Sequence, residues 1–173
     1  MFKALIDLLG ERKPNKSERK RASAVLYPNK INFDTYHKIG QKLWDWESSA
    51  NVTTLQRDAD DKDIGKTVRL HLDLTRYNFL FKKHNRVLAG KHLQKFLAAH
   101  GFQAYHELCE DALLVEIWET NEKIILVPTL NGGDSGRQRG FHSLDWKSIS
   151  CNKEISNEKL GAIVRKAWRR CDE

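Results

Sequence analysis

Two adjacent segments that are apolar on both faces constrain the fold of this chain most strongly. Residues 113–119 and 123–129 carry large apolar residues at both odd and even positions, and a polar turn separates them. Alternate residues of a strand face opposite sides of the sheet, so each segment would be buried on both sides. The sequence therefore predicts two interior strands, which residues 102–108 precede and residues 141–149 follow as further strands of an antiparallel meander.

Amphipathic helices are predicted on either side of this meander. Apolar residues spaced three and four apart indicate helices over about residues 34–46, 61–74, 88–100 and 157–170, with Gly101 ending the third. The predicted fold class is therefore α+β, an antiparallel meander of about four or five strands flanked by amphipathic helices.

Two of these helices share a motif that contains glycine. Ile64-Gly65-x-x-Val68-Arg69 recurs as Leu160-Gly161-x-x-Val164-Arg165, and Ile39-Gly40-x-x-Leu43 is a weaker third copy. Glycine inside a helix costs about 1 kcal/mol relative to alanine. Its repetition suggests that another backbone passes close to each glycine, and chance similarity between amphipathic helices is the alternative.

The N-terminal part of the chain is expected to lie outside the core. Residues 1–21 comprise a short amphipathic helix and a connector, residues 11–21, which has six basic residues and no large apolar one. The strand expected next, residues 22–27, ends before Pro28 and is assigned to the edge of the sheet. Residues 22–173 are expected to form one domain.

Composition indicates the cellular compartment of the protein but does not identify its partner. The 173 residues include 30 Lys and Arg and 23 Asp and Glu, a net charge of +7, which permits nucleic acid or another acidic partner. The longest apolar runs, 112–115 and 124–127, fall far short of the roughly 20 residues of a membrane helix. Cys109, Cys151 and Cys171 form no C-x-x-C pair, which is typical of reduced thiols. A cytoplasmic protein with no membrane partner is predicted.

Catalytic and cofactor-binding motifs give no strong signal. Residues 131–140 are rich in glycine but lack the Lys-Ser/Thr pair and the following helix of a P-loop. His106 and Cys109 have the spacing nearest to a metal-binding pair, although on the strand predicted there they would face opposite sides. Carboxylates between residues 107 and 119 would suit a metal nuclease, but any charged meander has them. We predict no enzymatic activity, no cofactor and no metal.

Nucleic-acid binding is the main alternative function that the residues themselves suggest. Between Leu74 and His106 there are six Lys and Arg, no Asp or Glu, and several interleaved aromatic residues. Basic charge neutralises phosphates and aromatic rings stack on bases. No RNP motif, KH loop or zinc-finger spacing accompanies the pattern, and a basic helix face over an apolar core would look the same.

Residues from about 60 to 173 resemble the immunity proteins of bacterial contact-dependent growth inhibition systems, the CdiI type. The likeness is carried by the motifs at residues 63–69 and 159–165, by the apolar strand that ends in Pro128, and by Phe141-His-Ser-Leu144 after the glycine-rich loop. The resemblance implies a cytoplasmic inhibitor that binds the C-terminal domain of a cognate toxin, often a nuclease, and needs no catalytic residues. Inhibitors of nucleases are often acidic, whereas this chain is basic.

Seven residues are predicted to contact such a toxin, and they are chosen by residue type because contact positions do not transfer within the family. Tryptophan and arginine are enriched at interfaces. An acidic cluster is included because either the toxin presents acidic groups or a local acidic patch of this chain engages it. The seven are Arg137 and Arg139 in the glycine-rich loop, Trp44 and Trp46 near an irregular segment, and Asp58, Asp60 and Asp61. Trp44 has packing in the core as an alternative role.

Overall fold

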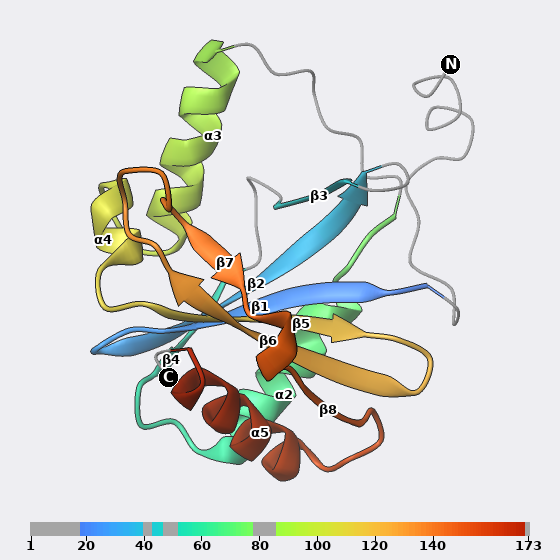
Figure 1. Cartoon of the computed structure of the whole chain (residues 1–173). Helices are drawn as coiled ribbons and strands as arrows, with labels where there is room; N and C mark the ends of the chain where they lie inside the picture. The colour runs from blue at the N-terminus through green and yellow to red at the C-terminus, as the bar shows by residue number, and fades with distance from the viewer. Residues whose placement is uncertain (1–17, 40–42, 47–51, 78–85, 172–173) are drawn as a thin grey trace, which may run out of the picture.

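The computed structural model describes residues 18–39, 43–46, 52–77 and 86–171 (Figure 1). One antiparallel sheet of eight strands lies between two layers of helices. Helices α2 (Asp61–Asp73) and α5 (Asn157–Arg169) cover its lower face, and α3 (Arg86–Ala99) and α4 (Tyr105–Cys109) lie above it. The predicted α+β class is confirmed.

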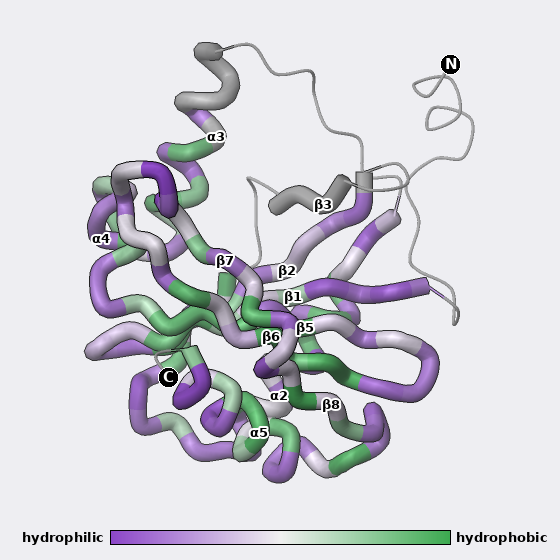
Figure 2. Tube along the Cα trace, in the orientation of Figure 1, coloured by the Kyte–Doolittle hydropathy of each residue, from purple (hydrophilic) through white to green (hydrophobic). Residues whose placement is uncertain are grey.

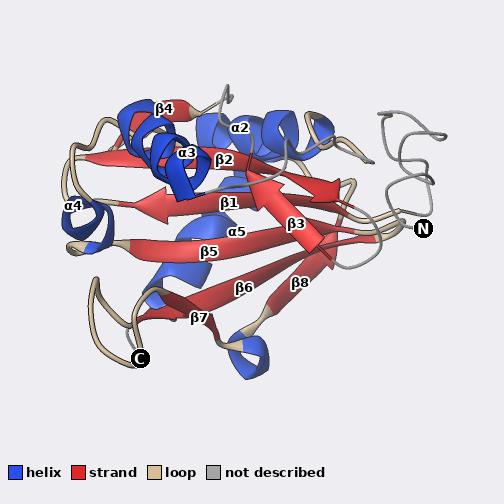
Figure 3. Cartoon of the chain, turned by 90° about the horizontal axis from the view of Figure 1, so that it is seen from above, coloured by secondary structure: helices blue, strands red, loops and turns tan. Residues whose placement is uncertain are grey.

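The strand order in the sheet is β3-β2-β1-β5-β6-β7, with β4 also pairing with β2 and β8 also pairing with β6 (Figure 3). The bounds of the strands are β1 Lys20–Leu26, β2 Lys30–Ile39, β3 Leu43–Trp46, β4 Thr53–Gln56, β5 Leu113–Glu119, β6 Lys123–Asn131, β7 Phe141–Ser143 and β8 Ile149–Asn152. Each edge of the sheet thus consists of two short strands, an arrangement that discourages pairing with other chains.

The same β-β-β-β-α unit occurs twice, as β1 to α2 and again as β5 to α5. In each unit the second strand pairs with the first, pairs with the fourth near its own start, and pairs with the third near its own end. The first strands of the two units, β1 and β5, lie side by side, and their middle residues Ser23 and Glu116 face each other. An approximate two-fold axis through this pair therefore relates the units, and α3 and α4 lie between them in sequence.

The repeated glycines lie where α2 and α5 cross. A Cβ atom at Gly65 would overlap the backbone carbonyl of Asn157, and a Cβ atom at Gly161 would overlap that of Asp61. The prediction that another backbone approaches each glycine is confirmed. The third copy of the motif is not helical, because Ile39 ends β2 and Leu43 begins β3, while Gly40 lies outside the described residues.

The arginines of the two motifs fasten the same crossing. Arg69 donates from Nε to Oδ1 of Asn157 at 2.9 Å and also donates to the carbonyl of Ile155. Arg165 donates from Nε to Oδ1 of Asp61 at 2.6 Å and also donates to the carbonyl of Ala59. Each arginine therefore binds the chain that leads into the other helix.

Hydrophobic residues are frequent along β5 and β6 (Figure 2), and a hydrophobic cluster lies on each side of the sheet. Below the sheet, Phe33 and Leu126 pack with Ile64, Leu160 and Trp168 from the two helices, all fully or almost fully buried. Above it a smaller cluster joins the sheet to α3 and α4, and its buried members are Val25, Tyr27, Leu97, Leu108 and Ala112. The prediction that β5 and β6 are interior strands is confirmed, and their lower faces are buried. Their upper faces are less completely covered, because Val127 is buried whereas Leu114, Trp118 and Ile125 are half-buried.

Three predicted helices are confirmed as α2, α3 and α5. The N-cap of α2 is Asp60, whose carboxylate accepts from the amide of Asp63 at 2.7 Å. Ser156 caps α5 in the same way. The chain leaves α3 through Gly101 with φ +75°. Helices α2 and α5 follow their local sequence patterns because a capping residue and an apolar stripe act together.

The helix predicted over residues 34–46 is wrong, because this segment forms β2 and β3. Both faces of β2 are buried, but several of its buried positions are occupied by polar residues. The remaining apolar residues are therefore spaced as they would be on one side of a helix. Phe33 and Thr35 lie on the lower side, and Asn32 and Asp34 on the upper side. The polar segment of residues 47–60, in which we expected no regular structure, contains a strand, β4, which pairs with the start of β2.

Three further strand predictions need correction. Residues 102–108 contain helix α4 instead of a strand, with Glu107 bonded to the amides of Gln103 and Ala104 that precede the helix. Residues 141–149 contain β7, a 3₁₀ turn η1 (Asp145–Lys147) and the start of β8. The first strand begins at Lys20, within the predicted connector, and lies in the centre of the sheet because it pairs with both β2 and β5. The predicted N-terminal helix lies outside the described residues.

Candidate functional site

The seven predicted contact residues lie at different ends of the sheet. We define the loop end as the end where β1, β4 and β6 finish and β2 and β5 begin, on the left of Figure 1. Arg137 and Arg139 lie there, in the loop of residues 132–140, and Asp58 follows β4 at the same end. Trp44 and Trp46 belong to β3, which pairs with the opposite end of β2, roughly 20 Å away at about 3.4 Å per strand residue. The structure therefore does not bring the arginines and the tryptophans together.

The backbone of the glycine-rich loop is held by its own hydrogen bonds. The amide of Gly132 donates to the carbonyl of Gly140 at 2.7 Å, and the amide of Gly140 donates to the carbonyl of Gly133 at 2.9 Å. A Cβ at Gly132 would overlap the carbonyl of Gln138, and Gly140 has φ +92°. The glycines thus produce a closed, ordered loop, which differs from the phosphate-binding turn that glycine content alone would suggest.

The two arginines of this loop differ in their surroundings. Arg137 is exposed near the tip. The guanidinium of Arg139 lies over the ring of Tyr105 in α4, with Cζ 4.3 Å from the ring centroid, a cation–π contact that holds this side chain against the helix. The loop end therefore presents one exposed cation near the loop tip and one cation oriented by α4.

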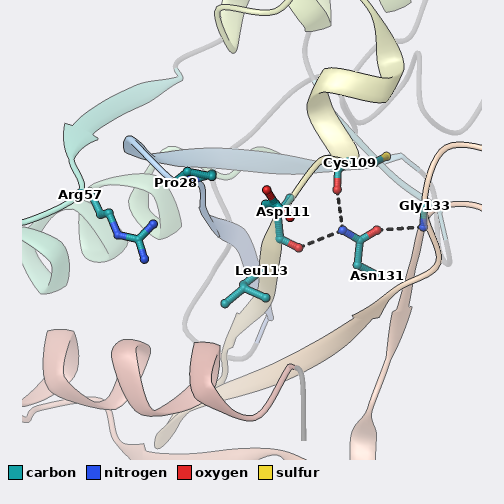
Figure 4. Close-up of a pocket in the computed structure, with 8 residues that line it drawn as sticks. Pro28, Arg57, Cys109, Asp111, Leu113, Asn131 and Gly133 are labelled. Carbon is teal, nitrogen blue, oxygen red and sulfur yellow. Dashed lines mark hydrogen bonds between the residues drawn. The ribbon is translucent and has the colours of Figure 1, made fainter.

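A pocket of about 500 Å³ opens beside this loop (Figure 4). Asn131 holds its inner wall, because its side-chain amide donates to the carbonyls of Cys109 and Ala112 at 2.6 and 3.0 Å while its oxygen accepts from the amide of Gly133 at 2.9 Å. Arg57 and Asp111 place one charge of each sign on the lining. The pocket is suited to receive a polar side chain of a partner more than an apolar ligand.

The three predicted acidic residues have different roles in the fold. Asp58 is exposed. Asp60 caps α2, and Asp61 forms an ion pair with Arg165 at 2.6 Å. Asp60 and Asp61 are therefore engaged in the packing of α2 and α5, and their contact with a toxin stays a prediction. So does the contact of Trp44 and Trp46, whose side chains lie outside the described part of the chain.

A buried ion pair anchors α3 above the sheet. Nε2 of His100 lies 2.7 Å from Oδ1 of Asp34, and Nδ1 of His100 donates to the carbonyl of Phe96 at 2.7 Å. Burial lowers the pKa of His100, but the hydrogen bond and charge of Asp34 more than offset this, so the pKa lies above its usual value. Ser23 donates to the other oxygen of Asp34 at 3.2 Å. These groups are almost fully buried, so they fasten the fold and are closed to a substrate.

The candidate metal pair differs in its exposure to solvent. His106 and Cys109 lie on α4 instead of a strand; His106 is exposed and Cys109 is buried. Within the described residues, no three His, Cys, Asp or Glu side chains converge as metal ligands would.

Sequence reasoning missed Trp146 as a surface residue. In the strand predicted over residues 141–149 it would share a face with Leu144, two residues earlier. It lies instead in η1 with 78% of its surface exposed, while Leu144 is buried. The turn is well anchored: the amide of Leu144 donates to the carbonyl of Pro128 at 2.8 Å, and Arg170 donates to the carbonyl of Lys147 at 2.8 Å. Asp145 and Ser148, both common in turns, were the signal that the strand stops here.

Comparisons with known proteins identify the family. The model of the CDI immunity protein family matches residues 20–171. A protein of unknown function from Neisseria meningitidis has a similar structure, with a TM-score of 0.76 and 17% identity over 91% of this chain and 98% of that one. A chain of the CdiA-CT/CdiI toxin and immunity complex from Yersinia pseudotuberculosis matches with a TM-score of 0.68 and 16% identity, over 89% and 98% of the two chains.

Two negative results complete the comparison. No curated protein sequence matches this chain significantly. Among the helices in the described ranges, none has the length and apolarity needed to cross a membrane. The family match spans β1 to the end of α5, and so includes both units of the fold and the helices between them. The chain therefore belongs to the CDI immunity protein family.

Proposed function

We propose that this protein neutralises one cognate toxin of a contact-dependent growth inhibition system by binding the toxin's C-terminal domain in the cytoplasm. The family match over residues 20–171 carries this proposal. The proposed mechanism is sequestration: the protein covers the toxin's active site or the approach of its substrate, and catalyses nothing itself. We further propose that the toxin domain is a nuclease, as the family resemblance implies.

The loop end is the proposed contact surface. Its loop is ordered before binding, so little conformational entropy would be lost on forming the complex. Arg137 and Arg139 supply the cations, the pocket beside Asn131 accepts a side chain, and Asp58 lies at the same end of the sheet. We keep Trp44, Trp46, Asp60 and Asp61 as weaker candidates, because the first two lie at the opposite end and the last two hold α2.

Co-expression tests the function directly. The toxin domain encoded beside this protein should arrest growth when expressed alone, and should permit growth and co-purify with the protein when both are expressed. Toxicity that persists in the presence of well-folded protein, with no complex recovered, would contradict the proposal.

Charge reversal in the glycine-rich loop tests the proposed surface. The double variant Arg137→Glu and Arg139→Glu should weaken toxin binding by about 10- to 100-fold, because arginines at the centre of an interface each contribute more than about 1 kcal/mol. Binding is measured by titration calorimetry. The control is Lys159→Glu with Lys166→Glu, two exposed lysines on α5 below the sheet, which changes the net charge equally. Equal affinities for the two double variants would show that the loop is not the contact.

Trp146 is an additional proposed anchor, because an exposed tryptophan on an anchored turn suits an interface. Trp146→Ala should weaken toxin binding by about 2 kcal/mol and change the free energy of unfolding by less than about 0.5 kcal/mol. Leu70→Ala, at a 50% exposed position on α2, is the control. Unchanged affinity of the Trp146 variant would remove η1 from the interface.

A further inference from the structure

Helix α3 rises away from the rest of the molecule and is fastened at its C-terminal turn (Figures 1 and 3). Leu97 belongs to the upper core cluster and Phe96 packs against it. The next residue beyond the helix, His100, forms the buried ion pair with Asp34. The last turn is therefore rigidly attached to the sheet.

The carbonyl at this helix end is also held. Nζ of Lys30 and the side-chain amide of Asn32 donate to the carbonyl of His100 at 2.6 and 3.1 Å. Both donors belong to β2, which runs through the interior of the sheet. These buried and half-buried polar contacts thus fix the direction in which α3 projects from the sheet.

The outer side of α3 is basic. Lys91 and Lys95 are exposed and one turn apart, so they lie on one side of the helix. Helical geometry places that side opposite Phe96 and Leu97, which face the core. The whole stretch from Leu74 to His106 has six Lys and Arg and no acidic residue, so no neighbour along the chain neutralises this charge.

The base of α3 adjoins the loop end. Phe102, Tyr105 and Phe141 pack against the same upper cluster as Leu97, and Arg139 lies over Tyr105. Helix α3, which carries the lysines, and the loop of residues 132–140, which carries the arginines, therefore lie above the sheet at the same end of the molecule (Figure 1).

We propose that α3 is an arm that binds an acidic surface of the toxin through Lys91 and Lys95. This inference rests on the proposed function. It is also consistent with the net charge of +7, because a basic arm complements a face of the toxin domain that is rich in Asp and Glu. On a nuclease, such a face would lie beside the basic groove that binds the substrate. Charges on such an arm act mainly by accelerating association, and their effect weakens as salt screens them.

The experiment compares two double charge reversals in the full chain. Lys91→Glu with Lys95→Glu changes α3, and Lys62→Glu with Lys66→Glu makes the same change on exposed positions of α2, also one turn apart. The α3 variant should associate with the toxin domain about 10-fold more slowly in low salt. The difference should shrink at high salt, and the α2 variant should stay close to the wild type. Lys91→Ala with Lys95→Ala should give a smaller effect of the same sign.

Each outcome bears on one proposal. If the wild type does not bind the toxin domain, the proposed function fails. If the wild type binds and the α3 and α2 variants associate equally fast, the arm is wrong while the function stands. Binding of a labelled single-stranded DNA is measured in parallel, and loss of DNA binding with unchanged toxin association would also overturn the arm and assign α3 to nucleic acid. Unfolding curves are recorded for both variants, which should be as stable as the wild type because all four lysines are exposed.

Discussion

Alanine at Gly65 or at Gly161 is expected to destabilise the protein by about 3 kcal/mol, a typical upper value for overpacking. Elsewhere in a helix the same change adds about 1 kcal/mol of stability, because alanine is the better helix former. Here each new methyl group would overlap a backbone carbonyl of the other helix, which no side-chain rotation relieves. The helices must separate, and the bonds of Arg69 and Arg165 at the crossing would lengthen.

Urea unfolding of the two variants measures this effect. The losses should agree within about 1 kcal/mol, because the two contacts are related by the approximate two-fold axis and overpacking typically costs 1–3 kcal/mol. Lys66→Ala, at an exposed position beside Gly65, should change stability by less than about 0.5 kcal/mol. Alanine variants that are as stable as the wild type would show that the helices are not in contact at the glycines.

Acid is expected to destabilise the protein through His71 as the pH falls from about 6.5 to about 4. This side chain is fully buried, with Nδ1 2.9 Å from the hydroxyl of Thr35 and Nε2 2.9 Å from that of Thr53. Burial lowers the pKa of His71 to about 4, and the charge of Asp34 opposes this only partly. His71 is therefore protonated near pH 6.5 in the unfolded chain but only near pH 4 in the folded chain. About 3 kcal/mol of the free energy of unfolding is lost between these two pH values.

His100 has the opposite dependence. Because its pKa in the folded state is raised, its contribution is complete below the unfolded value of about 6.5 and is lost as the pH rises through the folded pKa. The free energy of unfolding is measured from pH 4 to pH 9 for the wild type, His71→Gln and His100→Gln. His71→Gln should remove most of the decrease in the free energy of unfolding at acid pH. His100→Gln should remove most of the decrease at alkaline pH. His106→Gln, at an exposed position, is the control, and an acid slope unchanged by His71→Gln would contradict the assignment.

The proposed contact surface lies where the chain departs from its internal symmetry. The two β-β-β-β-α units share strand pairing, helix position and the glycine crossing, and together they form the scaffold. Helices α3 and α4 occur once, between the units, and the β6–β7 loop of residues 132–140 corresponds to the much shorter β2–β3 segment of residues 40–42. The symmetric scaffold forms the core, and we propose that these single-copy additions supply the asymmetric surface that recognises one partner.

Sequence patterns determined the elements whose stabilising contacts are local or repeated. The interior strands β5 and β6 follow from apolar residues on both faces, and α2 and α5 follow from caps and apolar stripes. The repeated glycines predicted a close helix contact, because a residue with a helix penalty at two equivalent positions needs a packing reason. The glycine-rich loop and its two arginines were also identified from the sequence.

Tertiary structure alone decided β2, α4 and the arrangement of the candidate site. Asp34 and Thr35 are buried in a strand because His100 and His71, distant in sequence, bond to them. Strand pairing placed Arg139 and Trp44 at opposite ends of the sheet, although residue type had grouped them. Local sequence patterns show which side chains are buried. The partners of a buried polar group and the neighbours of a loop depend instead on how distant segments pair. That pairing depends on the whole chain, so no local pattern predicts it.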